Sequence, residues 1–65
     1  MKLLLLDPWL MVVDKPAGLL SQPGLGLEQS DSVITRLQRQ EQGLRLVHRL
    51  DRDTSGVLLL VLTSL

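Results

Sequence analysis

The sequence predicts an α+β fold in which short apolar strands form a small sheet beside one helix. Three apolar runs, 3–6, 10–13 and 57–62, are bounded by turn residues, as β-strands usually are. Between the second and third runs, residues 31–42 place apolar side chains at helical spacing. With 65 residues, of which 45% are apolar and none is cysteine, the chain is at most one small domain without disulfides.

The first two strands are expected to pair as an antiparallel hairpin. Residues 7–9 form a connection short enough for a tight turn, although the common Asn-Gly pair is absent. Residues 18–30, which follow the second strand, contain three glycines and one proline. This composition predicts a long loop, and a long loop in a compact domain is usually functional or disordered.

Residues 31–42 are predicted to form the helix. Its apolar side chains share one face: Val33, Ile34, Leu37. Ser30 or Asp31 is the expected N-cap, and Gly43 is the expected end of the helix. A short extended stretch, 44–47, follows it.

The loop 48–56 carries most of the reactive side chains. Two carboxylates, two guanidiniums, an imidazole and two hydroxyls stand in nine residues: His48, Arg49, Leu50, Asp51, Arg52, Asp53, Thr54, Ser55, Gly56. The strand 57–62 that follows is apolar at every position, which predicts a central strand buried on both faces. A buried strand would hold the loop and its side chains in place.

The formal net charge is zero, but the charges are unevenly placed. Two lysines stand against four carboxylates up to residue 31, and five arginines against three carboxylates after it. Arginine suits forked hydrogen bonding to phosphate, although a solvated helix face with structural ion pairs explains the same pattern. The apolar run after Lys2 is interrupted at Asp7, and no run approaches a membrane span of about 20 residues. We expect a soluble, cytoplasmic protein without a membrane partner.

Asp51 and Asp53 are compatible with several kinds of site. They begin a calcium-loop pattern, but its twelfth position is Leu62 instead of a carboxylate. As a glycosidase pair they have no fixed separation, and Trp9 is the only ring for stacking a sugar. Flanking arginines would favour the charged form of Asp51, as a nucleophile or base requires. An Asp–Arg network that only holds the loop in shape is the alternative.

Two stretches resemble motifs of the RluA-type pseudouridine synthases. Residues 48–60, HRLDRDTSGVLLL, are similar to the central motif of that family, and residues 10–21, LMVVDKPAGLLS, to its N-terminal motif. Their order, with a helix between them, makes the resemblance specific. It implies the N-terminal portion of a catalytic domain with a mixed, mainly antiparallel sheet. Residues 1–65 are then expected to be a partial domain, truncated after the strand 57–62 and marginally folded alone.

The resemblance implies isomerisation of uridine to pseudouridine in structured RNA, either rRNA or tRNA, without a cofactor or metal. In the family the motif aspartate, here Asp51, attacks the target nucleoside. The N-glycosidic bond breaks, and the uracil turns and is rejoined through carbon 5. Arg49 is expected to take the place of the flipped base. Arg52 and Lys15 are the other expected RNA contacts; alternatively, Arg52 bonds to the backbone or to Asp53, and Lys15 shapes the pocket rim with Pro16 and Gly18. Five residues are expected to shape the loop: His48, Asp53, Thr54, Ser55, Gly56.

The resemblance ends at about Leu62. Members of the family continue into an Ala-Lys pair, a tyrosine-bearing strand and a further basic residue near the aspartate, whereas this sequence contains no tyrosine. Residues 1–65 are therefore expected to be inactive alone. An inactive remnant with at most weak RNA binding is the alternative function, and the sequence gives no indication of oligomeric state.

Overall fold

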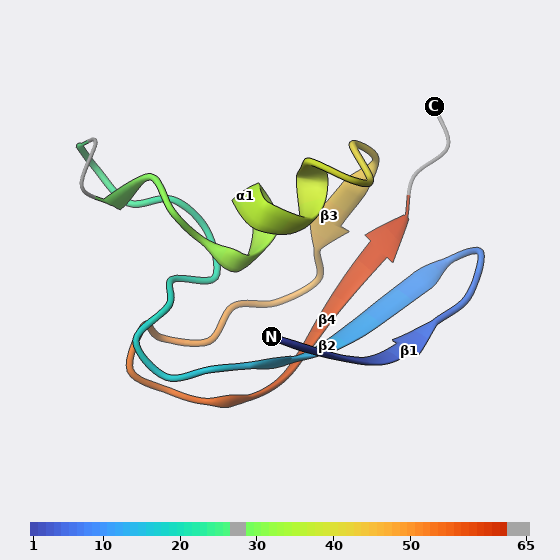
Figure 1. The fold of residues 1–65 in the computed structure, drawn as a ribbon, viewed down its shortest axis with the longest axis horizontal. Helices are drawn as coiled ribbons and strands as arrows, with labels where there is room; N and C mark the ends of the chain where they lie inside the picture. The colour runs from blue at the N-terminus through green and yellow to red at the C-terminus, as the bar shows by residue number, and fades with distance from the viewer. Residues whose placement is uncertain (27–28, 63–65) are drawn as a thin grey trace.

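The computed structural model describes residues 1–26 and 29–62, which form a four-stranded sheet with a short helix against one face (Figure 1). The elements are β1 (Lys2–Leu6), β2 (Leu10–Lys15), α1 (Val33–Gln38), β3 (Leu44–Leu46) and β4 (Gly56–Leu62). The strand order is β1-β2-β4-β3, and every pair of neighbouring strands in the described ranges is antiparallel. The α+β class is confirmed, and no parallel strand pair occurs in this part of the sheet.

The predicted hairpin is confirmed, and Asp7 closes its turn. One carboxylate oxygen of Asp7, Oδ1, accepts hydrogen bonds from the main-chain N–H groups of Trp9 (2.8 Å) and Leu10 (2.7 Å). The N–H of Asp7 in turn donates to the carbonyl of Leu10 (3.0 Å). This side-chain turn replaces the Asn-Gly turn that the sequence lacks. The register of β1 shifts between Leu3 and Leu5, where the strand carries a bulge.

The helix begins later than predicted. Ser32, and neither Ser30 nor Asp31, is the N-cap, because its Oγ accepts from the N–H of Thr35 (3.1 Å). Asp31 is engaged elsewhere, since its carboxylate accepts two hydrogen bonds from Arg36 (2.6 and 2.8 Å). Because Asp31 is engaged by Arg36, Ser32 provides the side-chain oxygen that caps the helix.

The helix also ends earlier than predicted, at Gln38, with Arg39 as the C-cap instead of Gly43. The N–H groups of Gln40 and Glu41 both donate to the carbonyl of Leu37 (3.1 and 3.0 Å), so the chain tightens into a turn. That turn leads directly into β3. At six residues, the helix of the described ranges is too short to cross a membrane.

Strand β4 is central, as predicted, because it pairs with β2 on one side and β3 on the other. The expectation that both its faces are buried is wrong for the described residues. Leu58 and Leu60 are fully buried, whereas Val57 and Val61 keep 51% and 36% of their surface exposed. Successive side chains of a strand point to opposite faces, and α1 covers only one of them.

The core lies between α1 and the covered face of the sheet. It consists of eight buried apolar residues: Met11, Val13, Leu19, Val33, Ile34, Leu44, Leu58, Leu60. Strand β1 lies outside it, with all five residues exposed. The last residue of β2, Lys15, is opposite Gly56, the first residue of β4. The segments after β2 and before β4 therefore leave the same end of the sheet and run side by side (Figure 1).

Candidate active site

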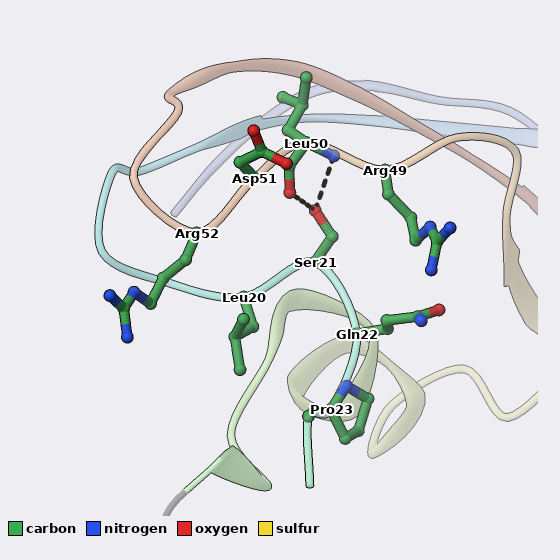
Figure 2. Close-up of a pocket in the computed structure, with 9 residues that line it drawn as sticks. Leu20, Ser21, Gln22, Pro23, Arg49, Leu50, Asp51 and Arg52 are labelled. Atoms are coloured by element: carbon green, nitrogen blue, oxygen red, sulfur yellow. Dashed lines mark hydrogen bonds between the residues drawn. The ribbon is translucent and has the colours of Figure 1, made fainter.

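An open pocket of about 520 Å³ lies between the loop before β4 and the segment that follows β2 (Figure 2). Nine residues line it: Leu20, Ser21, Gln22, Pro23, Gly24, Arg49, Leu50, Asp51, Arg52. The pocket thus brings Asp51, Arg49 and Arg52 together with the long loop, as far as that loop belongs to the described residues. Residues 27–28 of the predicted loop lie outside them.

Asp51 is exposed at this pocket, and its carboxylate has no hydrogen bond or ion pair to any residue in the described ranges. The guanidinium of Arg49 is likewise uncommitted within that part of the chain. In the view of Figure 2, Asp51 lies between Arg49 and Arg52, whose side chains leave the loop on opposite sides. A carboxylate and a guanidinium are therefore both available to a ligand.

Arg52 pairs with Asp53 and not with Asp51. Its Nε lies 3.4 Å from Oδ1 of Asp53, and both side chains are largely exposed. Of the roles expected for Arg52, the pairing with Asp53 is the one present in this structure. An exposed pair of this kind contributes about 0–1 kcal/mol, so a phosphate can replace Asp53 at little cost.

Lys15 is placed differently from the RNA contact that the sequence predicted. Its side chain is completely buried, and Nζ donates to the carbonyls of Pro16 (2.9 Å), Arg52 (3.0 Å) and Thr54 (2.7 Å). An ammonium group has three protons, and all three are used. In this structure Lys15 presents nothing to RNA and instead fixes the loop on the carboxyl side of Asp51.

Gly18 adds a second bond to the same stretch. Its N–H donates to the carbonyl of Arg52 (2.7 Å), and its φ of +91° lies in the region that glycine adopts without strain. Together, Lys15 and Gly18 hold the main chain of Arg52 and Thr54. The stretch 15–18 therefore supports the loop after Asp51.

Ser21 holds the loop on the other side of Asp51. Its hydroxyl accepts from the N–H of Leu50 (3.0 Å) and donates to the carbonyl of Leu50 (2.7 Å), as Figure 2 shows. Sequence reasoning did not single out Ser21. A polar residue directly after Leu19 and Leu20 was the available signal, since a buried hydroxyl needs a partner. The partner, 29 positions away, could not be identified from the sequence.

The remaining loop residues act through main-chain contacts. Nε2 of His48 accepts from the N–H of Leu59 (3.1 Å), which joins the start of the loop to β4 and requires a neutral imidazole. The N–H of Thr54 donates to the carbonyl of Asp51 (3.0 Å). Gly56 has a φ of +140°, a conformation that side-chain-bearing residues rarely adopt. The hydroxyls of Thr54 and Ser55 have no hydrogen bond to the described residues.

A bidentate ion pair joins Asp31, just before α1, to Arg36 within it. The hydrogen bond from Arg36 lowers the pKa of Asp31, and the same bond raises the pKa of Arg36. Within residues 1–26 and 29–62, no three His, Cys, Asp or Glu side chains cluster as metal ligands would. The pocket chemistry in this part of the chain is therefore that of one carboxylate, two guanidiniums, the side-chain amide of Gln22 and fixed main-chain groups.

Comparisons with known proteins connect these features to a family. The model of a family described as RNA pseudouridylate synthase matches residues 9–64. The chain is 53% identical over 58 residues to the Dual-specificity RNA pseudouridine synthase RluA of Escherichia coli K12, covering 89% of this chain and 26% of that protein. Proteins of the same name from Yersinia pestis (52% over 58 residues, 89% and 28%) and Vibrio parahaemolyticus (43% over 63 residues, 83% and 25%) are also similar. The chain thus spans about a quarter of the length of these curated relatives.

Proposed function

Because the chain belongs to the RNA pseudouridylate synthase family, we propose that it supplies the nucleophile loop of an enzyme that isomerises uridine to pseudouridine in RNA. Asp51 is the nucleophile in this proposal. The observation that supports it is an exposed carboxylate without a partner in the described ranges, on a loop whose main chain is bonded on both sides. A structural Asp–Arg network would instead have engaged this carboxylate.

The reaction assigns one role to Asp51. Its carboxylate attacks the target nucleoside while the N-glycosidic bond to uracil breaks. The uracil then turns, and carbon 5 forms the new glycosidic bond as the bond between the Asp51 carboxylate and the ribose breaks. The proton displaced from carbon 5 leaves to solvent and the freed ring nitrogen takes one up, so that the net change is an isomerisation and Asp51 is regenerated. Attack needs the charged carboxylate.

The arginines provide the RNA contacts of the proposal. A target uridine must leave its stack before Asp51 reaches it, at a cost of a few kcal/mol. Arg49 projects from the loop one residue before Leu50 and is free to occupy the vacated position. Arg52 exchanges its exposed partner Asp53 for a phosphate. The substrate class is structured RNA, rRNA or tRNA, met in the cytoplasm.

We further propose that residues 1–65 are one part of a larger catalytic domain. The pocket is open to water, whereas nucleophilic attack on a flipped base is favoured by an enclosed site. The alternative, an inactive remnant that binds RNA weakly, is favoured by the same openness. A measurement of pseudouridine formation distinguishes a part of a catalytic domain from an inactive remnant.

The test measures tritium release from RNA labelled at carbon 5 of uridine. The 65-residue chain is compared with a chimera in which it replaces the matching segment of the Escherichia coli relative. We expect release from the chimera and none from the chain alone. Asp51→Asn should lower release by about 1,000-fold or more, whereas Asp53→Asn, a matched carboxylate two residues away, should stay within about tenfold. A folded chimera that binds RNA but releases no tritium would support the remnant instead.

A further inference from the structure

Ser21 uses one hydroxyl to satisfy both main-chain groups of a single distant residue. Its side chain is only 3% exposed, and Oγ is bonded to both the N–H (3.0 Å) and the C=O (2.7 Å) of Leu50. Leu50 lies outside the strands, so no neighbouring strand pairs with it. The hydroxyl therefore supplies the hydrogen bonds that a neighbouring strand would otherwise give.

These two bonds fix the geometry on either side of Leu50. The N–H of Leu50 shares a rigid peptide plane with the carbonyl of Arg49, and its C=O shares one with the N–H of Asp51. Holding both planes sets φ and ψ of Leu50. The directions in which Arg49 and Asp51 leave the loop are set with them, and Figure 2 shows the two side chains on opposite sides of Leu50.

Ser21 is itself tied to the helix. Its carbonyl accepts from the N–H of Ile34 (3.1 Å), and the carbonyl of Leu20 accepts from the N–H of Val33 (2.8 Å). Both helix residues are in the core. A continuous path of hydrogen bonds therefore runs from the first turn of α1 through Ser21 to Leu50.

No other side chain of the described residues holds the loop directly before Asp51. Lys15 and Gly18 bond to Arg52 and Thr54, which follow the aspartate. His48 is bonded to β4, two residues before Leu50, so rotations about the main chain of Arg49 and Leu50 remain. Ser21 removes that freedom.

We propose that Ser21 is a positioning residue for the nucleophile: its paired hydrogen bonds to Leu50 aim the Asp51 carboxylate and the Arg49 guanidinium into the pocket between them. The inference rests on the proposed function. Although Ser21 lines the pocket, its hydroxyl is already bonded to both main-chain groups of Leu50, so its loss misdirects Asp51 without removing a free polar group. Misplacement of a reacting group by about 1 Å costs about 100-fold in rate.

The kinetic test uses the chimera described above, or the 65-residue chain if that alone is active. Ser21→Ala should lower kcat by about 10- to 100-fold while KM for RNA stays within about threefold. Ser21→Thr, which keeps the hydroxyl, should recover most of kcat. Ser32→Ala is the matched control, because Ser32 is also buried and its Oγ is also bonded, but to Thr35 in α1. It should lower the melting temperature and leave kcat near the parent value.

Equal kcat in Ser21→Ala and the parent would overturn the proposal, as would an equal fall in Ser21→Ala and Ser32→Ala. If neither the parent nor any variant makes pseudouridine, the proposed function has failed. The role of Ser21 in holding the loop is then tested separately, by hydrogen exchange of the 65-residue chain. Ser21→Ala should then speed exchange of the Leu50 amide by about tenfold or more, with core amides unchanged. Unchanged exchange at Leu50 would show that the hydroxyl does not hold the loop.

Discussion

Replacing Lys15 by methionine tests how far the loop depends on one buried ammonium group. Methionine has nearly the same length and no donor. The carbonyls of Pro16 and Thr54 lose their bonds to Nζ, whereas the carbonyl of Arg52 keeps the N–H of Gly18. Each acceptor left unpaired costs about 1–2 kcal/mol, and removing the buried charge returns part of its desolvation cost. We expect a net loss of about 2–4 kcal/mol in the free energy of unfolding.

For a domain of this size, 1 kcal/mol corresponds to about 4–8 °C, so Lys15→Met should lower the melting temperature by about 10–30 °C. A core this small supplies about 3–5 kcal/mol, so the variant should lose most of its cooperative transition. Thermal melts followed by circular dichroism measure both. Lys2→Met is the control, because Lys2 is exposed on β1 and should shift the melt by less than about 3 °C. A Lys15→Met melt within about 2 °C of the parent would refute the role of Lys15.

Two further predictions concern contacts outside the pocket. His48→Ala leaves the N–H of Leu59 without its acceptor and should lower the free energy of unfolding by about 1–2 kcal/mol in a urea titration; an unchanged midpoint would contradict this. Arg36 lowers the pKa of Asp31 in the folded chain, so the stabilisation is present above the ordinary value of 3.8 and is lost as the pH falls through the lowered pKa. Asp31→Asn should therefore melt below the parent at pH 7, with a difference that disappears in strong acid; a constant difference would disprove the pairing.

The hydrophobic pattern was sufficient to locate the strands and the helix, but not the ends of the helix. Asp31 and Ser32 are equally good N-caps by residue type. The choice depends on Arg36, which engages Asp31, and on the bridge between Leu20 and Ser32. Contacts between separate segments decide such boundaries, and local sequence does not encode them.

The candidate site likewise has residues that the sequence identified and contacts that it did not. Asp51, Arg49 and Arg52 were identified because their chemistry is concentrated in one short stretch, and all three line one pocket. The hydrogen bonds of Lys15 and Ser21 to the loop were not identified, because their acceptors lie 29 to 39 positions away in the sequence. Those acceptors are main-chain carbonyl oxygens, which every residue has, so the residue types in the sequence do not show which of them accept a hydrogen bond.

Support through main-chain acceptors leaves some side chains of the loop free to change. Three residues at and after the end of β2 hold the loop by hydrogen bonds to main-chain atoms of alternate residues. Ser21 bonds to Leu50, Gly18 to Arg52, and Lys15 to Arg52 and Thr54. These hydrogen bonds do not depend on the side chains at Arg52 and Thr54, whereas the side chain of Leu50 also packs against the core. Substitutions at Arg52 or Thr54 would change the surface beside Asp51 while the hydrogen bonds that support the loop remain.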